Sequence, residues 1–157
     1  MNYVGLENIE SNSGRLVGNT KTLYLDIKST KTCFKKGDVL YGKLRPNLNK
    51  VYLATDEGIC STDILVFRFG NENLAKFYAH YFLTQSFNEE VLQGVSGQQL
   101  PRTSWGNMQE IKIPVPPLPE QQKLVAEIEQ IEKQIADNQL IIHQSVAQKQ
   151  AVMKKYL

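Results

Sequence analysis

The sequence predicts an α+β protein, in which a globular domain of mixed strands and short helices is followed by one long C-terminal helix. Two observations support this prediction. The first part of the chain alternates short runs of β-branched and aromatic residues with glycine, proline and asparagine turns, which is typical of strands. From residue 118 onward there is no glycine, and no proline after Pro119. We therefore expect a globular domain over residues 1–117 and a helix over residues 118–157.

The strands of the globular domain are predicted from composition and from the turns between them. Turn signals occur at Lys36-Gly37-Asp38, Pro46-Asn47 and Glu57-Gly58. A further strand is expected just before the proline-rich junction, after a loop over residues 95–107 that contains two glycines. The predicted strands are residues 22–27, 37–44, 50–55, 63–69 and 108–115.

Two helices are expected between the last two strands. In residues 74–84 the apolar residues recur at helical spacing, and Asn71 precedes them as a candidate N-cap. Ser86 and Glu89 have the spacing of a capping box, which predicts a short second helix that ends at Gly94.

Composition limits the class of protein. The chain has 157 residues, which suits one globular domain with a modest core, and 41% of them are hydrophobic. No apolar run approaches the roughly 20 residues needed to cross a bilayer, and the N-terminus lacks the features of a secretory signal. Cys33 and Cys60 do not form a CxxC pair. Two buried thiols in a reducing cytoplasm are expected; a disulfide or a metal pair is the alternative.

The net charge of +2 conceals a basic block. Residues 15–50 carry nine basic and two acidic residues, a net charge of +7, whereas residues 51–157 carry nine basic and twelve acidic residues. A basic block on a nearly neutral chain is typical of a surface that binds a polyanion. The alternative is an ordinary solvated surface, because residues close in sequence need not share one face.

Two polar loops carry side chains suited to nucleic acid. Arginine and lysine bind phosphates and guanine edges, while asparagine and glutamine match adenine. The first loop lies within residues 41–50 and the second within residues 96–102, although ordinary polar loops are the alternative. The residues predicted to bind DNA are Lys35, Lys36, Lys43, Arg45, Asn47, Lys50, Gln98, Gln99 and Arg102.

The long helix has the apolar spacing of a coiled coil, with a polar residue inside the seam. An exposed apolar seam requires a partner, and a second copy of the chain is the simplest one, so we expect a homodimer. A helix that folds back onto its own domain is the alternative. The predicted seam residues are Leu124, Ile128, Ile131, Ile135, Asn138 and Ile142.

No catalytic motif is evident. The chain contains no GxGxxG, Walker, HExxH or GxSxG pattern. His80 and His143 lie within predicted helices, where a structural or solvent-facing role is expected. We therefore predict no catalytic residue and no metal ligand.

Several segments together resemble the specificity subunit of type I restriction-modification systems. They are "YVGLENIES", "GDVLYGKLRPNLNKV", "GICSTDILVFRF", "SGQQLPRTSWGNMQEIKIPVPPLPEQ" and "IPVPPLPEQQKLVAEIE", and they cover nearly the whole chain in the family's order. The resemblance implies that the globular domain is a target-recognition domain for one half of a split DNA site and that the long helix is a spacer, antiparallel to its counterpart. It implies separate methyltransferase subunits that use S-adenosylmethionine and restriction subunits that use ATP and Mg²⁺, with no cofactor in this chain.

The chain departs from the family pattern in its number of domains and helices. A full subunit carries two recognition domains and two helices, whereas this sequence has one of each, as expected for a natural half-subunit, a truncated gene or an engineered fragment. Two other functions stay open. The chain could be the recognition part of a fused restriction or methyltransferase enzyme with its own activity, or a coiled-coil adaptor that does not bind DNA.

Overall fold

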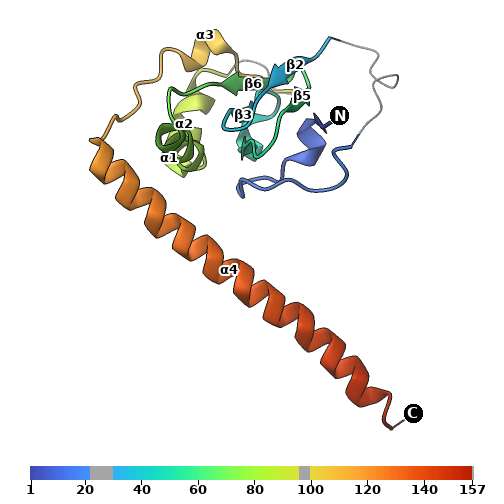
Figure 1. Cartoon of the computed structure of the whole chain (residues 1–157). Helices are drawn as coiled ribbons and strands as arrows, with labels where there is room; N and C mark the ends of the chain where they lie inside the picture. The colour runs from blue at the N-terminus through green and yellow to red at the C-terminus, as the bar shows by residue number, and fades with distance from the viewer. Residues whose placement is uncertain (22–29, 96–99, 157) are drawn as a thin grey trace. The chain divides into compact units, whose positions relative to one another are not determined.

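The computed structural model describes residues 1–21, 30–95 and 100–156 (Figure 1). The chain divides into two compact units, residues 1–116 and 117–157, which we call the globular unit and the helical unit. The division falls one residue before the predicted boundary. The predicted strand at 22–27 lies outside the described residues.

The described residues of the globular unit form two three-stranded sheets. In the first, β1 (Tyr3–Val4) runs parallel to β5 (Gly58–Cys60), and β2 (Thr32–Phe34) pairs antiparallel with the other side of β5. The second sheet has the order β4-β3-β6 and is antiparallel throughout. Its strands are β3 (Val39–Gly42), β4 (Val51–Leu53) and β6 (Ile64–Phe67).

Side chains of β3 alternate between two apolar layers, because successive residues of a strand point to opposite faces. Leu40 is fully buried in a cluster that also contains Val4 and Phe34, so this face of the second sheet packs on the first sheet. Tyr41 points to the other face, where its ring meets Phe82 and Phe87 edge-on. The globular unit is therefore a three-layer arrangement of sheet, sheet and helices.

The helical layer consists of α1 (Glu72–Phe82) and α2 (Gln85–Gln93). The side chain of Asn71 accepts a hydrogen bond from the backbone N–H of Leu74, so its predicted role as N-cap is confirmed. The second helix begins earlier than predicted, because Thr84 and not Ser86 caps it, while its end at Gly94 is confirmed.

Among the described residues, three short helical segments were not predicted: η1 (Leu6–Asn8), η3 (Pro46–Leu48) and α3 (Trp105–Met108). The predicted strand at 108–115 is wrong. Met108 ends α3, and the following residues form no strand and are largely exposed. Apolar residues there alternate with polar ones as in a strand, but no neighbouring strand pairs with them.

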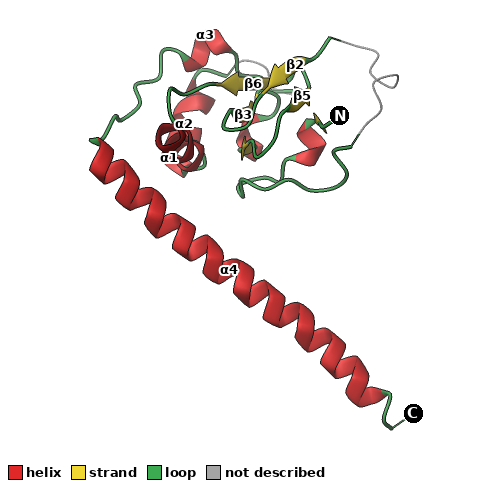
Figure 2. Ribbon diagram, viewed as in Figure 1, coloured by secondary structure: helices red, strands yellow, loops and turns green. Residues whose placement is uncertain are grey.

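The helical unit is one unbroken helix, α4 (Leu118–Met153), of 36 residues (Figure 2). At 1.5 Å per residue it is about 54 Å long. The apolar residues Leu124, Ile131 and Ile135 are 44–54% exposed, and Ile142 is 64% exposed. None of the described helices is both long enough and apolar enough to cross a membrane. The α+β class with a long C-terminal helix is confirmed.

The two cysteines are both free, but only one is buried. Cys33 lies opposite Ile59 in the β2–β5 pair and Cys60 lies opposite Thr32, so the two thiols point to opposite faces of the sheet. The prediction of two buried thiols is therefore wrong for Cys33, which is exposed on a strand at the edge of the sheet.

Candidate nucleic-acid interface

The two predicted polar loops lie side by side. We call residues 43–50 the proline loop and residues 100–104 the arginine segment. Leu44 and Arg102 form an antiparallel bridge, and the backbone N–H of Arg45 donates to the carbonyl of Pro101 at 2.8 Å. The N–H of Thr103 donates to the carbonyl of Lys43 at 3.0 Å. These bonds hold Arg45 and Arg102, which are 57 positions apart in sequence, on adjacent segments of backbone.

The proline loop is a tight turn around η3, held in an unusual backbone conformation. Arg45, before η3, and Asn49, after it, both have left-handed backbone angles, with φ of 51° and 44°. This region is disfavoured for residues with a side chain, so each position needs support from its surroundings. Asn88 of α2 supplies part of it by donating to the carbonyl of Pro46 at 2.7 Å.

Asn49 and Lys50 support the loop from within. The side chain of Asn49 is buried and donates to the carbonyl of Leu83 at 3.0 Å, and the ammonium of Lys50 donates to the carbonyl of Leu6 at 2.6 Å. Lys50, predicted to bind DNA, therefore already has a carbonyl partner within the fold.

Arg45 and Arg102 are the exposed cations of this surface. None of the described residues hydrogen-bonds to the Arg45 guanidinium. Arg102 pairs with Asp63 at 3.1 Å, yet its side chain is 55% exposed. Asn47 is exposed and Lys43 is half-buried in the same loop. Gln98 and Gln99, also predicted to bind DNA, lie outside the described residues.

Lys35 and Lys36 lie elsewhere. They occupy the turn between β2 and β3, before the first residue of β3, whereas the proline loop follows its last residue. The four residues of β3 span about 13 Å at 3.3 Å per residue. The basic block of the sequence is therefore divided between the two ends of one strand.

Sequence reasoning missed the residues that position the arginines. Asp63 holds Arg102, and Asn88 holds the proline loop through a backbone carbonyl. Asparagine has a low helix propensity, so Asn88 within a helix was a weak signal that its side chain had another role. Nothing local in the sequence indicated which carbonyl it binds.

The perturbed ionisable groups of the globular unit are unsuited to proton transfer near neutral pH. Hydrogen bonds from Arg68 lower the pKa of Asp38, so this carboxylate stays charged. Burial raises the pKa of Tyr41 to about 12 and that of Cys60 to about 11, so both stay neutral. In the described part of the chain no group of three or more His, Cys, Asp or Glu residues is arranged to hold a metal ion. The arrangement is suited to binding an anion.

Comparison with known proteins gives one consistent result. A family model described as "Type I restriction modification DNA specificity domain" matches residues 1–144. The "Type I restriction enzyme EcoDI specificity subunit" of Escherichia coli is 34% identical over 129 residues, which are 82% of this chain and 29% of that protein.

Two solved structures are also similar. One is the crystal structure of the HsdS subunit from Thermoanaerobacter tengcongensis, with a TM-score of 0.71 and 25% identity over 87% of this chain and 36% of that one. The other belongs to a study of complex assembly and conformational transition of the type I R-M system, with a TM-score of 0.73 and 24% identity. It covers 89% of this chain and 37% of that one, and it supports the fold alone.

The chain thus spans about a third of the length of these relatives. The family model nevertheless covers almost all of the 157 residues. The chain belongs to the family of type I restriction-modification DNA specificity domains.

Proposed function

We propose that this chain recognises one half of a bipartite DNA sequence through the proline loop and the arginine segment. The observation that carries the proposal is the pairing of Arg45 and Arg102 on adjoining backbone, with both guanidinium groups exposed. Arginine can bind the O6 and N7 atoms of guanine with two hydrogen bonds, and it also pairs with phosphates. Membership of the DNA specificity family supports the same function.

Arg45 is the residue we assign to base recognition. Its backbone is held in a disfavoured conformation by bonds on both sides, through Pro101 and through Leu48. Glycine would adopt this conformation without cost, so an arginine whose guanidinium has no partner among the described residues indicates a role outside the fold. Asn47, in the same loop, is placed to contribute a second polar contact.

A pair of glycine variants tests this assignment. Arg45→Gly should raise the free energy of unfolding slightly, by about 0.5 kcal/mol, because it relieves the backbone conformation. It should also weaken binding to a duplex selected from a random-sequence library by about 1–3 kcal/mol, and change the preferred base at one position. Titrations of labelled duplex and urea unfolding measure the two effects.

Asn49→Gly is the matched control, because Asn49 has the same backbone conformation but a buried, hydrogen-bonded side chain. It should lower the free energy of unfolding by about 1 kcal/mol through the lost bond to Leu83. If Arg45→Gly bound the selected duplex with the affinity and base preference of the parent chain, the assignment would be wrong.

The second part of the proposal is self-association through α4. Residues 118–137 carry five acidic and two basic residues, a net charge of −3, whereas residues 138–157 carry three lysines and no acid, a net charge of +3. Two copies that run antiparallel would bring opposite charges together along the whole helix, and a parallel pair would bring like charges together. Asn138, in the predicted seam, would fix the register.

An antiparallel homodimer has a consequence for the DNA target. Each globular unit is joined to the N-terminal end of its own α4, so the two units would be attached at opposite ends of the helix pair. Two identical recognition units under two-fold symmetry recognise an inverted repeat with a spacer between the half-sites. Sequencing of the methylated DNA from cells tests this: a dimer predicts a palindromic site, whereas an asymmetric site would contradict it.

The third part concerns the partners. We propose that the chain has no catalytic activity and docks methyltransferase and restriction subunits, which bring S-adenosylmethionine, ATP and Mg²⁺. The similarity to a subunit of the type I R-M system supports this division of roles. The purified chain should neither methylate nor cleave duplex DNA with labelled S-adenosylmethionine and Mg²⁺. Methylation should begin when the methyltransferase subunit is added, and turnover by the chain alone would contradict the proposal.

A further inference from the structure

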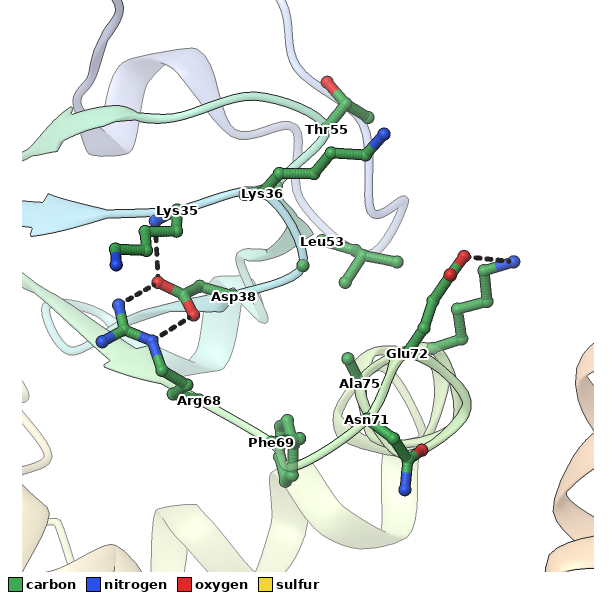
Figure 3. Close-up of a pocket in the computed structure, with 13 residues that line it drawn as sticks. Lys35, Lys36, Asp38, Leu53, Thr55, Arg68, Phe69, Asn71, Glu72 and Ala75 are labelled. Atoms are coloured by element: carbon green, nitrogen blue, oxygen red, sulfur yellow. Dashed lines mark hydrogen bonds and ion pairs between the residues drawn. The ribbon is translucent and has the colours of Figure 1, made fainter.

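A pocket of about 620 Å³ lies at the end of β3 that is distant from the proline loop. Its walls come from the turn between β2 and β3, the end of β4, the residues after β6 and the first turns of α1. Figure 3 shows Asp38 and Arg68 on one side and Asn71, Glu72 and Ala75 of α1 on the other. All of these elements belong to the globular unit.

The turn that forms one wall is fixed by hydrogen bonds. Gly37 has a φ of 87°, a conformation that suits glycine, and its N–H donates to the carbonyl of Ala54 at 2.8 Å. The N–H of Ala54 donates back to the carbonyl of Asp38 at 2.9 Å. The position of Lys35 and Lys36 is therefore set before any ligand binds.

The buried carboxylate of Asp38 orients Arg68. It accepts hydrogen bonds from Nε of Arg68 at 2.8 Å and from Nη2 at 2.6 Å, and a third from the backbone N–H of Lys35. These two side-chain bonds use two of the five N–H groups of the guanidinium, and the rest have no partner among the described residues. The Arg68 side chain is 58% exposed, so it can still bind an anion.

The pocket combines a net positive charge with an apolar surface. Four basic side chains line it, and two acidic ones, Asp38 and Glu72, neutralise part of this charge, which leaves a net charge of +2. The N-terminus of α1 adds a partial positive charge. Between these groups the surface is apolar, formed by Leu53, Phe69 and Ala75.

We infer that this pocket docks an acidic segment of the methyltransferase subunit, with one carboxylate on Arg68, a second on Lys36 and an apolar side chain against Leu53 and Phe69. The inference rests on the proposed function, because it names the surface used by a partner proposed there. The volume of the pocket fits one or two side chains. The guanidinium of Arg68, oriented by Asp38, can bind both oxygens of a carboxylate.

The apolar surface favours a protein segment over DNA. A phosphodiester contact needs exposed cations alone, and an apolar recess between them adds nothing to it. The acidic residues of α4 from a second copy are also a poor fit, because in the proposed dimer they face the lysines of the partner helix. Lys35 and Lys36, predicted from the sequence to bind phosphates, are thereby assigned to a protein interface.

Charge reversal tests the inference. Lys36 is exposed and has no partner among the described residues, so Lys36→Glu should fold normally. Lys112→Glu is the matched control, since Lys112 is an exposed lysine of the globular unit outside the pocket. Leu53→Gln removes apolar surface without adding charge. The probes are the purified methyltransferase subunit of the same system and the library-selected duplex, titrated at about 0.15 M salt.

Lys36→Glu should weaken binding of the methyltransferase subunit at least tenfold, and Leu53→Gln severalfold. Both should bind the duplex as Lys112→Glu does. A loss of duplex affinity by Lys36→Glu beyond that of Lys112→Glu would overturn the inference in favour of a phosphate contact. Unchanged binding of both probes would overturn it while leaving the proposed function intact. A parent chain that bound neither probe would overturn both.

Discussion

The globular unit and the helical unit treat their apolar side chains in opposite ways. In the globular unit Tyr41 and Phe87 are almost completely buried: their rings meet edge-on, and Phe87 stacks on Phe82. On α4 the apolar residues Ile131 and Ile135 are about half exposed. A side chain contributes to stability through the surface that it removes from water. Burial therefore stabilises the globular unit, and we propose that Ile131 and Ile135 gain comparable burial only in a helix pair.

The largest effect should come from truncating the buried aromatic cluster. Phe87 is 2% exposed, and its ring stacks on Phe82 with centroids 4.5 Å apart. Phe87→Ala should lower the free energy of unfolding by about 3–5 kcal/mol, because it leaves a cavity. Urea unfolding followed by the fluorescence of Trp105, the one tryptophan in the sequence, measures this. Leu140→Ala on exposed α4 should change it by less than about 0.5 kcal/mol. Similar losses of stability for both variants would contradict the conclusion that burial stabilises the globular unit more than α4.

The next largest effect concerns the seam of α4. Ile131→Glu or Ile135→Glu would place a charge inside the proposed helix pair, where it has no partner. Self-association should weaken at least tenfold, with the unfolding of the globular unit unchanged, as judged by sedimentation and urea unfolding. Gln130→Glu, one residue away on an exposed part of the helix, should associate like the parent chain. A parent chain that sediments as a monomer at tens of micromolar would rule out self-pairing.

The Asp38–Arg68 pair should make the stability of the globular unit sensitive to acid. Hydrogen bonds from Arg68 hold the pKa of Asp38 below its usual value of 3.8. A lowered folded-state pKa means that the stabilisation is present above 3.8 and is lost as the pH falls through the folded-state value. Asp38→Asn should cost about 2 kcal/mol at pH 7.

That cost should shrink as the pH falls below about 4, because Asp38 is protonated first in the unfolded chain and then, at its lower pKa, in the folded chain. Urea unfolding at pH 7 and at pH 2.5 compares the two proteins. A difference that stayed constant with pH would show that packing, and not ionisation, explains the effect of the substitution.

The smallest effect distinguishes the two directions in which the helices could pair. Replacing both Lys154 and Lys155 with glutamine removes two of the three positive charges of residues 138–157, just after the last residue of α4. In an antiparallel pair this loses attraction to acidic residues, so association should weaken by about 0.2–1 kcal/mol per charge at low salt. In a parallel pair it would relieve repulsion and strengthen association. The sign of the change, measured by sedimentation at low salt and again at 1 M salt, separates the two.

The sequence was most informative where structure depends on neighbours in the chain. The Asn71 cap, the end of α2 at Gly94 and the long helix were all predicted from local patterns. The strands β1, β2 and β5, of two or three residues each, were not predicted. The strand predicted at 108–115 has the right composition but no partner, since pairing is decided by distant residues.

In the candidate site, too, contacts between residues distant in sequence could not be predicted. Arg45 and Arg102 could be chosen from their residue types, but their pairing depends on the bridge between Leu44 and Arg102. The use of Asn49 and Lys50 inside the fold depends on carbonyl groups of Leu83 and Leu6. Residue type alone cannot separate a side chain that binds a ligand from one that supports a loop.

The parallel pairing of β1 with β5 also sets an order of folding. Tyr3 lies opposite Ile59, 56 positions away, whereas Tyr41 of β3 lies opposite Val51 only ten positions away. Closing the longer loop costs about 1.5 kcal/mol more chain entropy. We expect the β3–β4 hairpin and α4 to form early and the first sheet to close late, because non-local strand pairing is slow. In pulsed hydrogen exchange the amides of β3 should gain protection before those of β1.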